Sequence, residues 1–173
     1  MFNCDRIDLK IIDLLMEDAR MPAAEIARRV GGGISERVVR YRLERLVREK
    51  IISLTAVVNP KSLGYSIVAD VWLECESDSI LKVAEKLSQY EMVSYVACAI
   101  GETDVSVQVI AKDASEVYSF VTGVVGKVPG VRKTTTSIVP LVLKDVFHWR
   151  IPSGLTENAL VKNSRSAAKR AKP

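Results

Sequence analysis

The residues best suited to chemistry lie on one face of the segment Ser35–Lys50. In a helix, where each residue turns by about 100°, Val39, Leu43 and Leu46 fall on one apolar stripe. The opposite face is basic with one aromatic ring, and it carries Arg37, Tyr41, Glu44 and Arg48 with Arg40 and Arg45 at its flanks. Arginine donates two hydrogen bonds to guanine, and basic side chains bind phosphate. The chemistry that this face offers is therefore recognition of a nucleic acid.

Six residues of this segment are predicted to bind DNA: Ser35, Arg37, Arg40, Tyr41, Arg42 and Arg45. We expect Arg37, Arg40 and Tyr41 to lie near bases, whereas Arg42 and Arg45 are expected to meet phosphate. Glu36 has two open interpretations, because it can accept a hydrogen bond from cytosine or complement the positive end of the helix. Taken alone, an arginine-rich helix is also typical of a merely solvated surface, so the surrounding elements decide.

No catalytic or metal-binding set is expected. His148 is the only histidine, so a Ser-His-Asp triad or a histidine-based metal cluster cannot be assembled within one chain. Cys4, Cys75 and Cys98 are scattered, which fits neither a disulfide framework nor a zinc cluster and favours a reducing cytoplasm. The glycines at 31–33 lack the Lys-Ser or Lys-Thr that follows a phosphate-binding loop. We therefore expect no enzyme, no cofactor and no metal ion.

Three short helices are predicted to position the basic face. The first follows a cap at Asp5 and ends near Asp18. The second begins at Pro22 and must break at the three glycines 31–33, and Ser35 caps the third. This order is typical of a helix-turn-helix, in which the first helix of the pair braces and the second lies in the major groove.

The pattern after Ile51 changes to β-branched and aromatic residues. From residue 66 it predicts strand 66–76, helix 79–89, strand 93–100, a turn at 101–104, strand 105–111, helix 115–125 and strand 131–142, with 144–149 as a possible added edge. The order β-α-β-β-α-β is the ferredoxin-like arrangement, whose helices cover one face of an antiparallel sheet. The other face would be bare and apolar, and a second copy of the chain is its simplest cover.

The fold class is therefore α+β, with a winged-type helix-turn-helix followed by a βαββαβ domain. Four parts are expected: a DNA-binding domain over 1–52, a linker over 53–65 with a strand at 53–59, an effector-binding and oligomerisation domain over 66–149, and a basic, disordered tail over 150–173. No apolar stretch reaches the ~18 residues of a membrane span, and the first residues do not resemble a secretory signal. A cytoplasmic location is expected.

The charge distribution supports a polyanionic partner. Residues 28–50 hold eight basic and three acidic side chains, and residues 150–173 hold six and one. Residues 51–149 hold eight basic and eleven acidic side chains, so the positive charge is concentrated outside the predicted sheet domain. Positive charge gathered at two places on a near-neutral body is typical of a nucleic-acid binder.

The sequence also resembles the Lrp/AsnC (feast/famine) regulators over roughly residues 4–145. The similar stretches of the predicted DNA-binding domain are 5–12, 24–30, 35–46 and 51–52. The stretch 56–65, Ala-Val-Val-Asn-Pro-Lys-Ser-Leu-Gly-Tyr, is similar to the family's linker. Gly101-Glu102-Thr103-Asp104, Val128-Pro129-Gly130-Val131 and the following polar strand are similar to its sensor domain. Each motif is short, but their order and spacing together are specific.

The resemblance implies a homodimer that builds tetramers or octamers, and a sensor domain that binds amino acids at contacts between dimers. The implied effector-binding residues are Gly101, Thr103, Asp104, Thr134 and Thr136. Backbone N–H groups exposed at Gly101 suit a carboxylate, and Asp104 suits an α-ammonium group. A plain hairpin turn is the competing interpretation of Gly101 and Asp104. Three features depart from the family pattern: the additional glycine at 31–33, Glu36, and Thr103 in place of an aromatic residue.

Two other functions stay open on the sequence alone. An architectural protein that coats DNA without sequence choice would also use a basic tail. Some sirohaem decarboxylases resemble this family, but they need a tetrapyrrole pocket, and the stretch 104–109 here is regulator-like. The partners that we expect are double-stranded DNA, a second copy of the chain and an amino-acid effector, with no membrane.

Overall fold

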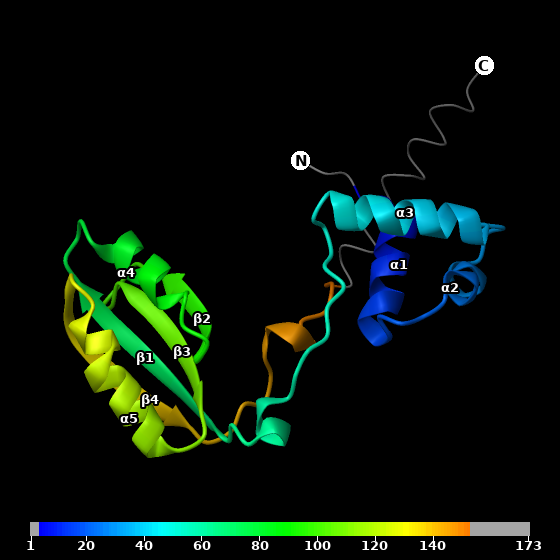
Figure 1. Ribbon diagram of the computed structural model, residues 1–173. Helices are drawn as coiled ribbons and strands as arrows, with labels where there is room; N and C mark the ends of the chain where they lie inside the picture. The colour runs from blue at the N-terminus through cyan, green and yellow to red at the C-terminus, as the bar shows by residue number, and fades with distance from the viewer. Residues whose placement is uncertain (1–3, 153–173) are drawn as a thin grey trace. The chain divides into compact units, whose positions relative to one another are not determined.

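The computed structural model describes residues 4–152 of the 173-residue chain, and these form two compact units (Figure 1). The helical unit contains the described residues up to Val57 together with those from Lys144 onward. The sheet unit is Val58–Leu143. The chain thus starts in the helical unit, builds the sheet unit, and returns to the helical unit. No described helix is both long and apolar enough to cross a membrane.

The helical unit begins with α1 (Arg6–Glu17), α2 (Ala23–Val30) and α3 (Glu36–Arg48). Asp5 Oδ1 accepts a hydrogen bond from the Asp8 backbone N–H (2.9 Å), and Asp8 Oδ2 accepts one from the Asp5 N–H (3.1 Å). This reciprocal capping box fixes the start of α1. Ser35 Oγ accepts a hydrogen bond from the Val38 N–H at 3.4 Å and caps α3. The three predicted helices are confirmed.

The turn between α2 and α3 is set by backbone conformation. Gly31, Gly32 and Gly33 have φ angles of 73°, 68° and 73°, which only glycine adopts readily. A Cβ added at any of them would meet nothing within 4 Å, so the need for glycine is conformational rather than steric. Lys10 of α1 donates from Nζ to the Val30 carbonyl (3.2 Å), which satisfies the end of α2 just before this turn.

The core of the helical unit is one apolar cluster that draws on all three helices. Ile11, Ile26, Val39 and Leu46 are fully buried in it. Burial of such a side chain stabilises the fold by about 1.5–3 kcal/mol. Leu43 is partly buried against the same cluster. The apolar stripe predicted for the third helix therefore faces inward, and its basic side faces away from the core.

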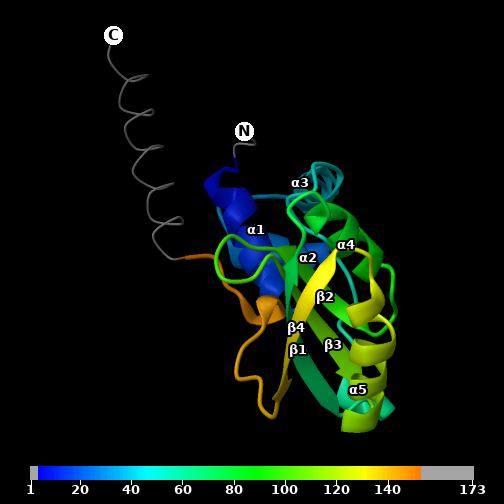
Figure 2. The same cartoon turned by 90° about the vertical axis from the view of Figure 1, so that its left-hand side faces the viewer.

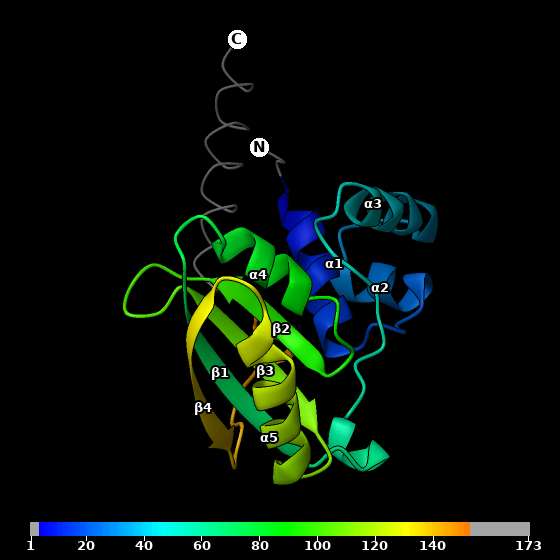
Figure 3. The ribbon, with the colours of Figure 1, turned by 60° about the vertical axis from the view of Figure 1, so that its left-hand side comes forward.

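The sheet unit contains β1 (Ile67–Cys75), α4 (Ile80–Leu87), β2 (Val93–Cys98), β3 (Val105–Ala111), α5 (Ala114–Gly123) and β4 (Val131–Val139). The four strands are antiparallel to their neighbours in the order β2-β3-β1-β4. Both helices lie on the same side of the sheet (Figure 2; Figure 3). This arrangement confirms the predicted βαββαβ, ferredoxin-like fold.

The two faces of the sheet differ in chemistry. On the covered face, alternate residues of β1 and β3 pack with α4 and α5 in one core, which includes Val71, Leu73 and Val107. The open face was predicted to be apolar, and the structure corrects this, because it mixes apolar and polar residues. Trp72 of β1 is flanked there by two polar pairs: Gln108 Nε2 donates to Asp70 Oδ1 (3.1 Å), and Lys133 Nζ donates to Glu74 Oε1 (2.8 Å).

Two predicted strands are not formed. Residues 53–59 have no strand, because no described segment pairs with them, and a short 3-10 turn, Pro60–Leu63, follows. The described residues of the helical unit contain no strand, so its helix-turn-helix stands without the paired strands of a wing. The last predicted strand ends at Val139 rather than 142, and the proposed edge at 144–149 is instead a 3-10 turn, Val146–His148, capped by Asp145.

The end of the described chain belongs to the helical unit. The Arg150 guanidinium donates to the Met16 carbonyl in the last turn of α1, and Ile151 packs against the helical core. Trp149 lines a cavity of about 270 Å³ together with Leu15 and Met16. The sheet unit therefore ends at Leu143 rather than at the predicted 149. The predicted disorder of the tail concerns mainly residues 153–173, which lie outside the described residues.

Candidate nucleic-acid interface and candidate effector site

The exposed face of α3 carries the residues predicted to lie near bases. Arg37, Arg40 and Tyr41 are all exposed, and they lie within the first half of the helix. Ser35 stands immediately before them as the helix cap. The structure therefore brings four of the six predicted DNA-binding residues together on one exposed surface at the N-terminal end of α3.

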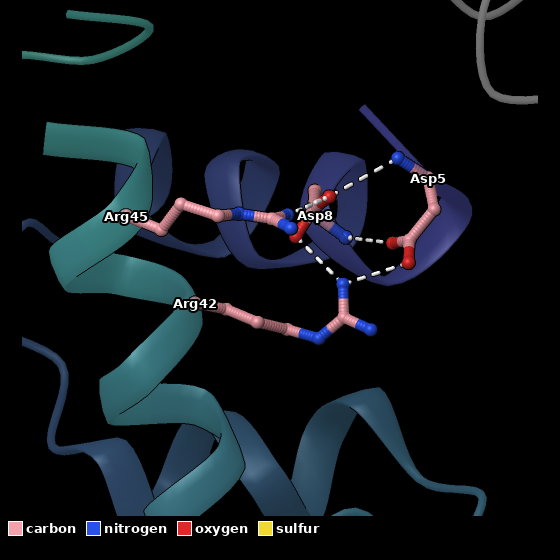
Figure 4. Close-up of polar contacts among 4 residues, drawn as sticks. All are labelled: Asp5, Asp8, Arg42 and Arg45. Carbon is pink, nitrogen blue, oxygen red and sulfur yellow. Dashed lines mark hydrogen bonds and ion pairs between the residues drawn. The ribbon is translucent and has the colours of Figure 1, made fainter. Parts of the chain in front are cut away.

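Arg42 and Arg45 make contacts within the chain that the sequence did not predict (Figure 4). Arg42 Nη1 donates to Asp5 Oδ2 (2.7 Å) and to Asp8 Oδ1 (2.8 Å). Arg45 Nη2 donates to Asp8 Oδ2 at 2.6 Å. The side chain of Asp8 is 0% exposed, and those of Arg42 and Arg45 are 19% and 28% exposed. These contacts brace α3 against the start of α1, and contact of Arg42 and Arg45 with phosphate stays a prediction.

Electrostatics at this cluster follows from burial and pairing. Burial alone would raise the pKa of Asp5, but hydrogen bonds from the Asp8 backbone N–H and from Arg42 outweigh it and hold that pKa below its usual value. Burial alone would lower the pKa of Arg42, but its hydrogen bonds to Asp8 and Asp5 raise it. Both shifts favour the charged forms, so the ion pairs persist at neutral pH.

A sequence signal for the cluster exists in α1. Asp8 lies three and four residues before the buried Ile11 and Ile12, and therefore on the inward face of that helix. A carboxylate on an apolar face requires a cationic partner. The helical periodicity of residues 35–50 cannot by itself show a partner on another helix.

A second arginine–carboxylate contact lies on the exposed face of α3 itself. Arg40 Nε donates to Glu36 Oε1 at 3.0 Å, and Arg40 Nη2 donates to the same oxygen. The two residues are four apart, so this contact is one turn of helix long. Neither interpretation of Glu36 made from the sequence included it.

The candidate effector residues of the sheet unit gather near the end of β1. The Asp104 backbone N–H donates to the Leu73 carbonyl (2.8 Å), and Asp104 Oδ2 accepts from the Cys75 N–H (2.7 Å). Leu73 pairs on its other side with Thr134 of β4. The backbone of β1 thus has Asp104 on one side and Thr134 on the other.

The other three candidates are less enclosed. Thr136 pairs with Val71 and is exposed, whereas Thr103 is half-buried. Gly101 is exposed in the β2–β3 connection with a φ of 155°, a value that favours glycine. The structure therefore places Thr103 next to Asp104, Thr136 two residues along β4 from Thr134, and Gly101 in the connecting turn.

The negative charge of Asp104 affects its surroundings. Burial raises the pKa of the Cys75 thiol, and the Asp104 carboxylate raises it further. A carboxylate that accepts a backbone hydrogen bond through one oxygen keeps acceptor capacity on the other. Asp104 can therefore support the end of β1 and still accept a hydrogen bond from a ligand.

An uncharacterised helix-turn-helix-type transcriptional regulator from Pyrococcus horikoshii is 37% identical over 141 residues, which cover 81% of this chain and 88% of the relative. A family model of the AsnC-type helix-turn-helix domain matches residues 5–47, and one of the Lrp/AsnC ligand-binding domain matches residues 68–146. The chain belongs to the Lrp/AsnC family. Another relative, the regulator LrpA from Pyrococcus abyssi, is 35% identical over 136 residues, which cover 78% of this chain and 95% of LrpA.

Solved structures of Lrp/AsnC proteins share the fold. Escherichia coli AsnC is 22% identical with a TM-score of 0.75, and the match covers 87% of this chain and 99% of AsnC. A transcriptional regulator from Neisseria meningitidis, solved as a complex with L-methionine, is 25% identical with a TM-score of 0.75, covering 87% of this chain and 97% of that one. The protein is therefore a transcriptional regulator with a DNA-binding helix-turn-helix and an Lrp/AsnC ligand-binding domain.

Membership of the Lrp/AsnC family separates the alternatives left by the sequence. Relatives of the chain are named transcriptional regulators. These names favour a regulator over a DNA-coating architectural protein and over a sirohaem-decarboxylase-like enzyme. Within residues 4–152, no group of three or more His, Cys, Asp or Glu side chains is arranged to hold a metal ion.

Proposed function

We propose that this regulator reads DNA through the exposed N-terminal half of α3, and that an amino acid bound by the sheet unit modulates the binding. One observation carries the first part. The Asp8 carboxylate fixes the inward side of α3 through Arg42 and Arg45, while Arg37, Arg40 and Tyr41 stay exposed on the outward side. A rigidly held helix with an exposed basic face is what major-groove recognition requires.

The residues of this face have distinct tasks in the proposal. Arg37 and Arg40 supply the paired donors that match guanine, and Tyr41 supplies an aromatic surface beside them. Ser35 accepts the cap hydrogen bond and keeps its hydroxyl proton available for a phosphate oxygen. Arg42 and Arg45 position the helix, and their contact with phosphate stays a prediction.

The proposed effector is an amino acid, the class to which the L-methionine in the Neisseria meningitidis relative belongs. Its ammonium group would meet Asp104, and its carboxylate would meet the backbone at Gly101 and Thr103 and the hydroxyls of Thr134 and Thr136. The position of Asp104 and Thr134 on either side of Leu73 supports this assignment.

The proposed assembly is a homodimer or a larger even-numbered oligomer in the cytoplasm. The open face of the sheet presents Trp72 and Tyr95 among polar groups, and Tyr95 is exposed in the single chain. A second copy would cover this face symmetrically. Two α3 helices would then read an imperfect palindrome whose half-sites are about one DNA turn, or a multiple of it, apart.

The test is a gel shift of the full chain on its own upstream DNA and on random DNA of equal length. It is run at ~0.15 M salt with and without an amino-acid mixture, since salt sets the nonspecific background. Binding to the upstream fragment alone, altered by the mixture, is the expected result. Equal binding to both fragments would contradict sequence-specific reading by α3.

The effector site has a separate variant, Asp104→Asn. Asparagine keeps an oxygen that accepts from the Cys75 N–H, but it lacks the charge that would attract an ammonium group. We expect DNA binding to be unchanged and the response to the amino-acid mixture to be lost. An unchanged response would show that Asp104 does not bind the effector, whereas loss of both properties would indicate a folding role.

A further inference from the structure

Glu36 and Arg40, one helical turn apart on the outward face of α3, form an ion pair. Arg40 uses Nε and Nη2, the side edge of its guanidinium, to donate to one oxygen of Glu36. The side chains of Glu36 and Arg40 nevertheless stay 45% and 65% exposed. The end of the guanidinium, formed by Nη1 and the second Nη2 proton, makes no hydrogen bond to a described residue and stays available to a partner outside the chain.

The pair is favoured before DNA arrives. A glutamate four residues N-terminal to a basic residue is the better orientation for an ion pair within a helix. Glu36 also lies in the first turn of α3, where the helix dipole favours a negative charge. Arg37, its neighbour in sequence, has no such partner among the described residues. One arginine of the proposed reading face is therefore held in place while the adjacent one is not.

We propose that Glu36 is a positioning residue that holds Arg40 for base reading and restricts its use on phosphate. The inference rests on the proposed function, namely that α3 reads DNA. A held guanidinium loses less rotamer freedom when its end meets the N7 and O6 atoms of guanine. At the same time the negative charge of Glu36 offsets the attraction of Arg40 for any phosphate nearby. Glu36 thereby raises specificity without adding affinity.

This assignment predicts opposite changes in two quantities, the affinity for random DNA and the ratio of specific to random binding. In Glu36→Gln, one negative charge is removed, and the charge-assisted contact that holds Arg40 is weakened to at most a neutral hydrogen bond. Binding to random DNA should strengthen severalfold and become more salt-dependent, by about one phosphate contact. The ratio of specific to random binding should fall about fivefold to tenfold, because a bidentate base contact discriminates on that order. Both binding constants are measured by fluorescence anisotropy across a salt series.

The matched control is Glu44→Gln. Glu44 is exposed on the same helix, and no described side chain pairs with it. The charge change is identical, so binding to both DNAs should strengthen together and the ratio should stay constant. If Glu44→Gln lowers the ratio as much as Glu36→Gln does, the effect is one of charge, and the positioning role is wrong.

Selection from a random duplex library locates the effect. The unaltered protein should select a symmetric site, and Glu36→Gln should lose its preference at one guanine in each half-site while other positions keep theirs. The site selected by Glu44→Gln should be unchanged. The inference would be overturned if Glu36→Gln lost its base preference across the whole site. It would also be overturned if Glu36→Gln kept its preference at every position.

The variant Arg40→Lys separates this inference from the proposed function. Lysine keeps the charge but lacks the planar, paired donors. If Glu36 acts through Arg40, Glu36→Gln should change the specific-to-random ratio no further in the Arg40→Lys background. An unchanged ratio in Arg40→Lys itself would refute base reading by this residue. If the specific-to-random ratio falls in Arg40→Lys but is unchanged in Glu36→Gln, only the role of Glu36 is refuted.

Discussion

One buried carboxylate links two helices of the helical unit. Asp8 is fully buried, and each of its oxygens accepts a hydrogen bond from a different arginine of α3. One of these oxygens also accepts from the Asp5 N–H. A buried carboxylate is stable only when such partners replace water. Asp8 therefore joins the start of α1 to the middle of α3 in a defined register.

Removing this charge should weaken the helical unit. In Asp8→Asn the shape is kept, but the guanidinium groups of Arg42 and Arg45 lose the charge that compensates their partial burial. We expect the free energy of unfolding to fall by about 3 kcal/mol, since removing one partner of a buried ion pair is strongly destabilising. Urea unfolding followed by circular dichroism measures it. Asp13→Asn, on the exposed side of the same helix, is the control and should change little.

The same cluster predicts an acid dependence of stability. The folded-state pKa of Asp5 is lowered, so below the unfolded value of about 3.9 the unfolded chain binds more protons than the folded one. The contribution of Asp5 is present above that value and is lost as the pH falls through the folded pKa. In Asp5→Asn, which retains a capping oxygen, the urea midpoint should depend less on pH in this acidic window. A pH dependence equal to that of the unaltered protein would contradict the assignment.

At the scale of elements, local signals were sufficient wherever local contacts set a boundary. The caps at Asp5, Ser35 and Asp113 and the glycines before α3 act within a few residues, so the sequence predicted the helices near them. The β-branched residues of β1 and β3 likewise predicted two strands, and the structure shows alternate residues of both to be buried. From these elements the βαββαβ order followed.

Contacts between distant residues were not predictable in the same way. Arg42 and Asp5 are 37 positions apart, and the periodicity of α3 cannot show that a carboxylate faces it from α1. Residues 53–59 have the composition of a strand, but a strand also needs a partner, which no described segment supplies. The edge strand predicted at 144–149 was wrong for a related reason. The apolar residues of this segment suit an edge strand, but the segment lies in the helical unit and not beside the sheet.

The end of α1 provides a test at this scale. Its last turn has no basic residue, and Arg150 supplies a cation from far along the chain by donating to the Met16 carbonyl. A positive charge at a helix C-terminus stabilises it by about 0.3–1 kcal/mol, so Arg150→Ala should lower the stability of the helical unit by that order. Thermal unfolding measures the change. Lys144→Ala, an exposed change in the same segment, should have no effect, and an equal loss there would contradict the contact.

The whole molecule divides its two tasks between chemically different units. Basic residues are concentrated in 28–50, within the helical unit, whereas 51–149 carries more acidic than basic side chains. The net negative charge of residues 51–149 repels the phosphate backbone of DNA. Contact through the basic stretch 28–50, which contains α3, is therefore favoured. We therefore expect the basic stretches 28–50 and 150–173 to be drawn toward DNA before any specific contact forms.

The return of the chain to the helical unit makes the sheet unit an insertion between two pieces of the DNA-binding half. A fragment cut at Val57 would lack Trp149, Arg150 and Ile151, and with them one wall of a cavity and part of the core. Exchange of the sheet unit of this chain for another sensor module therefore requires two junctions, one near residues 57–58 and one near residues 143–144. A hybrid protein joined at the first junction alone would have a helical unit that lacks Trp149, Arg150 and Ile151.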